Sequence, residues 1–293
     1  MSETTLSAHV RPEFENRNLG DAKEVVVERA LTLTERIANI NAVRKLTILL
    51  GLIVAWQAYT VIAAPEPLLF PSFTATMEAM WRSLADGTLF QKVWISVEVL
   101  LLGYAAGLAA AAVLLVLAVS TRIGRDILGT LTAMFQPLPA ISLLPLAMLW
   151  FGLGIPSLIF VTVHSVLWAV ALSTHVGFMA VSETQRMVGR NYGLRGIRYI
   201  ALILVPAAFT SILTGLKIGW AFAWRTLIAA ELVFGAASGD GGLGWFIYEK
   251  GENLETADVF AGLFMVIVVG LIVENLIFRR IENSTVNKWG MLR

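Results

Sequence analysis

The chain has 293 residues, of which 57% are hydrophobic and only 15% are charged, whereas soluble domains are about 45–50% apolar and about 25% charged. This excess of apolar residues excludes an ordinary soluble domain, and the formal net charge of +1 gives no indication of a nucleic-acid partner. The absence of cysteine also excludes disulfides, thiolate metal sites and cysteine nucleophiles.

The polar N-terminal segment, residues 1–43, is predicted to be a cytoplasmic tail. Leu31, Ile37 and Ile40 lie on one face of this segment if it is helical, so the alternatives are a partly ordered tail and an interfacial helix. The apolar run that begins near Leu46 lacks a small-residue cleavage site. We therefore interpret it as a retained membrane anchor.

Six stretches of the chain are long and apolar enough to cross a membrane, which takes about 20 residues in a helix. They are residues 46–64, 92–119, 128–150, 155–180, 201–235 and 258–279. Glycines and a proline in residues 151–156 predict a tight outer turn between the third and fourth stretches. The fold class is therefore an all-α polytopic membrane protein. We expect a transmembrane domain over residues 44–281 and a cytoplasmic C-terminal tail over residues 282–293.

The distribution of Lys and Arg predicts the orientation, because these residues accumulate in cytoplasmic loops. If the N-terminus is inside, the inner segments include Arg122, Arg125 and four arginines within residues 186–198. The outer loops have few cations, and residues 240–258 are rich in Asp and Glu. Both termini are therefore predicted to be cytoplasmic.

Three glycine patterns differ in what they predict. The G-x-x-x-G patterns at residues 103–107 and 215–219 favour close packing of helices. Residues 239–244 match the dinucleotide-binding pattern G-x-G-x-x-G, but they follow a transmembrane stretch and no strand precedes them. We interpret this last pattern as a turn at the outer mouth.

The sequence contains no motif of an enzyme. There is no G-x-x-x-x-G-K-[ST] phosphate-binding loop, so ATP hydrolysis has to come from another chain. His164 and His175 are separated by about 16 Å along one helix and cannot share a metal within it. We predict no catalytic residue, no metal site and no cofactor.

The loop between the fourth and fifth stretches, residues 181–206, is long and polar enough to form a short surface helix. Gly193 is predicted to end this helix, and Pro206 lies where the chain returns to the membrane. On physical grounds alone, a plain loop that obeys the positive-inside rule is an equal alternative.

The spacing of Gly193, Ile203 and Pro206 resembles the EAA signature of ABC importer permeases, in which a Gly is followed at fixed distance by Ile-x-Leu-Pro. Val205 occupies the position of the Leu, and the triplet that gives the signature its name falls at residues 187–189 and departs from it. Other segments resemble the nitrate, taurine and sulfonate subfamily in the same order. They are residues 135–154, 212–219, 229–231, 242–244 and 256–258.

This resemblance, which covers roughly residues 65–280, implies a type I (MetI-like) permease fold in a bacterial inner membrane. It also implies import of a small anionic solute such as nitrate, a sulfonate, taurine or a carboxylate. The alternative is an ion-coupled secondary transporter without an ATPase partner. Several intramembrane Asp or Glu residues in the early stretches and an inverted repeat would favour that alternative, whereas the first four stretches contain only Glu98 and show no inverted repeat.

The resemblance further implies the partners. A helix around residues 184–196 is expected to dock on a cytosolic ABC ATPase dimer, which binds the ATP. We also expect a second permease copy in a homodimer, a periplasmic or lipid-anchored substrate-binding protein, and membrane lipid, but no nucleic acid. The residues predicted to couple the loop to the ATPase are Arg186, Met187, Arg190, Tyr192, Gly193, Arg195 and Pro206.

The fifth stretch contains charges that are costly inside a membrane, where one charge at the bilayer centre costs at least about 2.5–3.5 kcal/mol. Lys217 and Glu231 are about 21 Å apart along the helix, so each charge needs a partner on another helix, water or cargo. Arg225 offers a planar fork that suits oxyanions. Trp220 and Trp224 are predicted to form an apolar wall beside it, which makes these five residues a predicted substrate path.

Overall fold

The computed structural model describes residues 41–234 and 241–285. The chain divides into two compact units, Met1–Ile53 and Val54–Arg293. Helix α2 (Asn41–Ile62) corresponds to the first predicted membrane stretch and crosses that boundary. The predicted tail face of Leu31, Ile37 and Ile40 lies outside the described residues, as does most of the C-terminal tail.

The described residues are helical throughout their regular structure, which confirms the predicted fold class. Within the part of the chain that the structure describes, four helices are long and apolar enough to cross a membrane, or up to six if each of two bent pairs is one span. The unbroken ones are α2, α4 (Thr88–Ser120), α7 (Ile155–Met179) and a continuous C-terminal helix. That last helix consists of α13 (Thr256–Ile272), the π-helix η4 (Val273–Phe278) and α14 (Arg279–Ser284).

The third and fifth predicted stretches are broken rather than continuous. Helix α5 (Arg122–Phe135) meets the segment formed by η2 (Ala140–Leu143) and α6 (Leu144–Phe151) at a bend of 91°. The break falls at Gln136-Pro-Leu-Pro139, because proline removes a helical hydrogen bond and disfavours helical geometry in the residue before it.

The second bend of 83° separates a membrane-entry segment from α11 (Phe209–Phe234). The entry segment consists of α9 (Gly196–Tyr199), the π-helix η3 (Ile200–Leu204) and α10 (Val205–Ala207). Pro206 therefore lies where the chain changes direction, as its position in the sequence predicted.

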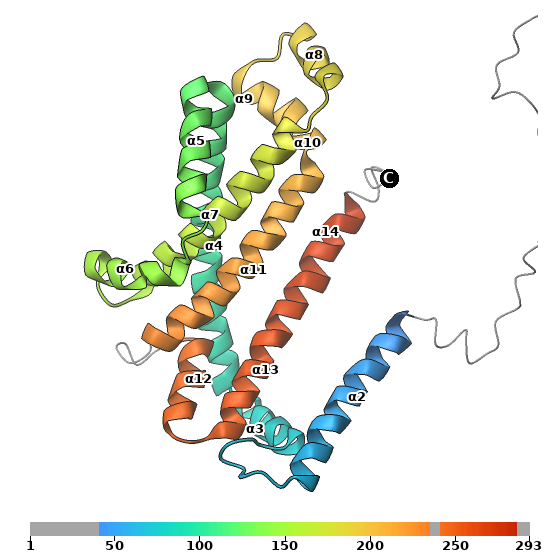
Figure 1. The fold of residues 1–293 in the computed structure, drawn as a ribbon, viewed down its shortest axis with the longest axis vertical. Helices are drawn as coiled ribbons and strands as arrows, with labels where there is room; N and C mark the ends of the chain where they lie inside the picture. Colours follow the sequence, from blue (N-terminus) through green and yellow to red (C-terminus); the bar gives the residue numbers. More distant parts are fainter. Residues whose placement is uncertain (1–40, 235–240, 286–293) are drawn as a thin grey trace, which may run out of the picture. The chain divides into compact units, whose positions relative to one another are not determined.

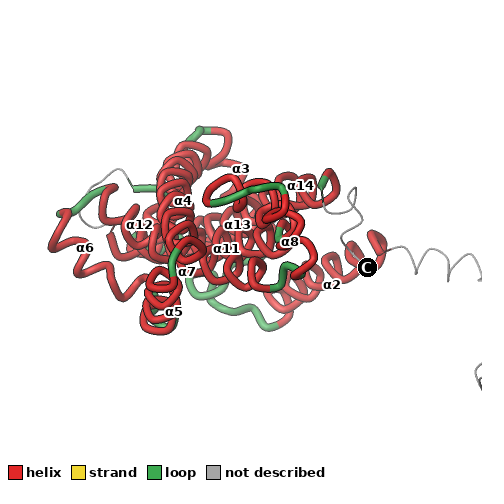
Figure 2. The backbone as a smooth tube through the Cα atoms, turned by 90° about the horizontal axis from the view of Figure 1, so that it is seen from above, coloured by secondary structure: helices red, strands yellow, loops and turns green. Residues whose placement is uncertain are grey.

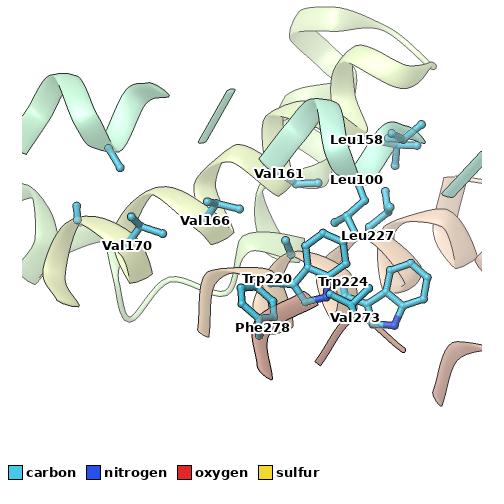
Figure 3. Packing of buried hydrophobic residues seen from close by; sticks show 14 of the residues in the cluster. Leu100, Leu158, Val161, Val166, Val170, Trp220, Trp224, Leu227, Val273 and Phe278 are labelled. Atoms are coloured by element: carbon cyan, nitrogen blue, oxygen red, sulfur yellow. The ribbon is translucent and has the colours of Figure 1, made fainter. Parts of the chain in front are cut away.

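Helix α7 packs between α4 and α11, and Figure 2 shows α7 and α11 side by side. The two G-x-x-x-G patterns make both contacts close. A Cβ atom on Gly103 would lie 2.7 Å from Thr162, and one on Gly215 would lie 2.8 Å from Ser173. The predicted packing role of these glycines is confirmed. Leu100, Val166 and Leu227 contribute to the buried cluster around α7 (Figure 3).

Two short helices were not predicted from the sequence. Helix α3 (Phe73–Ala85) begins after Ser72, whose hydroxyl accepts a hydrogen bond from the amide of Ala75. Helix α12 (Leu243–Glu252) lies in the segment that was interpreted as an outer loop. Both helices lie at the end of the bundle opposite to α8 (Glu183–Asn191) (Figure 1).

Candidate functional site

The polar loop between α7 and the membrane-entry segment contains the surface helix that the sequence predicted. Helix α8 begins after Ser182, whose hydroxyl accepts from the amide of Gln185. Gly193 follows the end of the helix at a φ of +70°, a left-handed conformation that favours glycine. The predicted helix and its glycine stop are both confirmed.

The predicted coupling residues do not all face solvent. Met187 and Tyr192 are 52% and 81% exposed, and the side chains of Arg190 and Arg195 are also exposed. By contrast, Arg186 donates from Nε and Nη2 to carbonyl oxygens at the C-terminal end of α7, those of Val181 and Phe178. In the structure, the hydrogen bonds of Arg186 therefore connect α8 to the C-terminal end of α7.

Lys217 and Glu231 on α11 find partners on other helices, which is one of the three alternatives that the sequence left open. Lys217 Nζ lies 2.7 Å from an oxygen of Glu282 and 3.7 Å from one of Glu274. Both glutamates belong to the continuous C-terminal helix. Lys217 therefore joins α11 to that helix through an ion-pair network.

Glu231 is 2% exposed and belongs to a buried hydrogen-bond network at the opposite end of α11. The hydroxyl of Ser96 on α4 lies 2.8 Å from both carboxylate oxygens, and the amide of Gly244 donates to one of them at 2.8 Å. The amide of Leu243 in turn donates to the oxygen of Ser96. The network thus ties the N-terminal end of α12 to α4 and α11, and it satisfies amides that have no partner inside their own helix.

Trp220 and Trp224 lie in the core of the bundle rather than beside Arg225. Trp220 stacks edge-on against Tyr104, with 5.5 Å between the ring centroids. Trp224 donates from its ring nitrogen to the carbonyl of Val266 at 3.2 Å. Figure 3 shows both indoles within the cluster of buried side chains, near Phe278. The structure therefore does not bring the two tryptophans together with Arg225 as a wall.

Arg225 instead lines a cavity of about 590 Å³ between the break after α5, α7 and α11. Its guanidinium lies over the ring of Phe222 at 5.1 Å from the centroid, and its Nε donates to the carbonyl of Ala221. Within the described ranges, no carboxylate lies within ion-pair distance of Arg225. The described residues that line the cavity include no Asp or Glu.

The other walls of this cavity combine polar groups with aromatic rings. Ser165 donates to the hydroxyl of Thr226 at 2.8 Å, and both residues line the cavity. His164 and Trp168 also line it, and their ring nitrogens Nε2 and Nε1 are buried without a hydrogen-bond partner within the described part of the chain. The arrangement offers one cation and several neutral polar groups beside an apolar surface.

Sequence reasoning identified Arg225 but not the residues around it. His164 and Ser165 lie on a different stretch, α7, and the segment 136–139 was assigned to an unbroken span. The two prolines of that segment could have indicated this wall of the cavity, since prolines predict a break in the helix and the break lines the cavity.

Residues 103–283, more than half of the chain, match the family described as "Binding-protein-dependent transport system inner membrane component". The taurine transport system permease protein TauC of Escherichia coli is 28% identical over 79% of this chain and 86% of its own length. The putative aliphatic sulfonates transport permease protein SsuC of Escherichia coli is 27% identical over 75% of this chain and 82% of its own. The nitrate import permease protein NrtB of Synechocystis is 27% identical, over 77% and 83% respectively.

Proposed function

We propose that this chain, which belongs to the binding-protein-dependent transport system inner membrane components, carries a small anion. It is a permease subunit of an ABC importer in the membrane. The observation that supports this proposal is Arg225, a cation without a carboxylate partner in the described ranges, at a cavity of about 590 Å³. The ion-coupled alternative loses its basis, since the family is that of ABC transport permeases.

The chemistry of the cavity favours an oxyanion over a cation. A guanidinium attracts an anion and repels a cation, and its planar fork matches the oxygens of a sulfonate, nitrate or carboxylate. Three relatives are named for taurine, aliphatic sulfonates and nitrate, each of which presents such oxygens. The hydroxyls of Ser165 and Thr226 supply further hydrogen-bonding groups near the anion.

Uptake by Arg225 variants tests the anion proposal. Arg225→Gln should reduce uptake of an anionic substrate about tenfold or more, because a hydrogen bond to a charged group contributes about 1.5–3 kcal/mol. Arg225→Lys keeps the charge and should retain part of the uptake. The measurement is uptake of a radiolabelled anion by cells or proteoliposomes, normalised to the amount of protein in the membrane.

Arg122→Gln is the matched control, because Arg122 is exposed and lies outside the cavity. It removes one positive charge elsewhere and should leave uptake near the wild-type level. Normal uptake by Arg225→Gln would refute the proposal. Failure of Arg225→Gln and Arg225→Lys alike to accumulate in the membrane would assign Arg225 a structural role instead.

We also propose that the chain acts as a homodimer with a cytosolic ATPase dimer docked on α8. The exposed side chains of Met187, Tyr192, Arg190 and Arg195 support this docking, since aromatic, Met and Arg side chains are enriched at protein interfaces. A substrate-binding protein would then dock at the opposite end, near α3 and α12. The basic loop at α8 supports a cytoplasmic orientation for that end and for both termini.

Gly193 provides the test of the docking proposal. Valine at this position is strained, because a β-branched side chain rarely adopts a φ of +70°. Gly193→Val should therefore reposition the end of α8 and either weaken assembly with the ATPase or separate ATP hydrolysis from transport. Gly129→Val on α5 is the control and should behave as wild type, because a side chain added there meets open space at an ordinary φ. Normal transport and coupling in Gly193→Val would count against docking at α8.

A further inference from the structure

A second cavity lies at the end of the bundle that carries α8. Its volume is about 330 Å³, and it is lined by residues at the ends of α4 and α7 and by residues of α5, α8, α9 and η3. Since one water occupies about 30 Å³ of liquid, the cavity has room for roughly ten water molecules. A phosphate group with part of its hydration shell fits this space.

The charged side chains that line this cavity, among the described residues, are three arginines. Arg125 on α5 and Arg186 and Arg190 on α8 line it together with His175 of α7, and the described residues that line it include no carboxylate. Gathering like charges around one small space is unfavourable unless an anion or bulk water compensates them. The charge of the lining residues therefore favours an anion over a cation.

One of the three arginines already has partners within the protein. Arg186 donates to carbonyls at the end of α7 and lies 3.7 Å from Glu183. No ion-pair partner occurs for Arg125 or Arg190 within residues 41–234 and 241–285. Their guanidinium groups remain available to an anion in the cavity.

Two buried polar atoms of lining residues give independent support. The hydroxyl of Tyr199 and Nδ1 of His175 are inaccessible to solvent and have no hydrogen-bond partner in the described part of the chain. Buried polar atoms are almost always satisfied, so an unsatisfied pair in one cavity indicates a missing partner. An oxyanion accepts hydrogen bonds from a tyrosine hydroxyl and an arginine at the same time.

We propose that this cavity, between α5, the end of α7 and α8, is a binding site for a phosphate-type oxyanion. Helices α4 and α7 are long and apolar enough to cross a membrane, and both end at the cavity. We therefore infer that the cavity lies near the membrane surface. Basic pockets at this level bind the phosphate head groups of anionic lipids. A free phosphate ion has the same chemistry, and the experiment below distinguishes the two sources.

The experiment measures the melting temperature of the purified full-length chain in mild detergent during titration with three separate probes. The probes are dioctanoyl phosphatidylglycerol, inorganic phosphate, and zwitterionic dioctanoyl phosphatidylcholine as a control. A ligand of the folded state raises the melting temperature as its concentration exceeds its Kd. We expect a saturable rise with phosphatidylglycerol or with phosphate, but not with phosphatidylcholine.

Variants test whether the rise in melting temperature depends on residues of the cavity. Arg125→Gln should raise the probe concentration needed for the same rise in melting temperature about tenfold or more. Tyr199→Phe should also raise it while preserving the fold. Arg122→Gln is the matched control, since Arg122 is an exposed arginine on the same helix that does not line the cavity.

The responses to the probes distinguish a lipid head group from a free phosphate ion. A response to phosphatidylglycerol alone identifies a lipid head group, and a response to phosphate that competes with the lipid identifies a site open to the free ion. Absence of any response in the wild type would overturn the proposal. An equal loss in Arg122→Gln and Arg125→Gln would also overturn it, because the effect would then reflect surface charge rather than the cavity.

Discussion

Removal of the Glu231 carboxylate should loosen α12 from the rest of the bundle. In Glu231→Ala, the hydroxyl of Ser96 and the amide of Gly244 lose their acceptor in a place that is closed to solvent. An unsatisfied buried donor costs about 1–3 kcal/mol, so the two together cost roughly 2–6 kcal/mol. Each kcal/mol lowers the melting temperature of a chain of this size by about 2–4 °C. We therefore expect a fall of at least roughly 4 °C.

The assay is thermal unfolding of the detergent-solubilised protein, combined with Ser96→Ala in a double-mutant cycle. Because Glu231 and Ser96 belong to one network, the double variant should be less destabilised than the sum of the single variants. Glu249→Gln, at an exposed carboxylate on α12, should have little effect. A Glu231→Ala protein that melts within about 1 °C of wild type, or strict additivity with Ser96→Ala, would refute the reasoning.

Two further predictions concern stability. Gly107→Ala should destabilise the folded protein by roughly 1–3 kcal/mol, because the added Cβ would lie 2.7 Å from Val166. Gly129→Ala, with open space around it, should leave the stability unchanged or raise it by up to about 1 kcal/mol. Equal melting temperatures of the two variants would contradict this. The amide of Thr88 donates to Asp86 and holds the pKa of that carboxyl below its ordinary value of 3.8. The contribution of Asp86 is therefore present above pH 3.8 and is lost as the pH falls below it, so Asp86→Ala should lower the melting temperature at neutral pH but not in strong acid.

Much of the fold followed from hydropathy and from glycine and proline chemistry. The uncharged runs of α4 and α13 predicted their spans, since a backbone in a membrane has to satisfy its hydrogen bonds internally. Gly193 and Pro206 indicated the end of α8 and the turn into the membrane. The bend of 91° after α5 was not predicted, because apolar residues continue on both sides of the break and hydropathy carries no information on the direction of the helix axis.

The site depended far more on tertiary structure. Sequence alone predicted that Arg225, Lys217 and Glu231 need partners, because unpaired charges in a membrane are costly. Only the folded chain decided that Lys217 pairs with glutamates of the C-terminal helix and that Glu231 accepts from Ser96. These partners are 65 and 135 residues away along the chain, and contacts at such separations are set by how α4, α11 and the C-terminal helix pack rather than by local pattern.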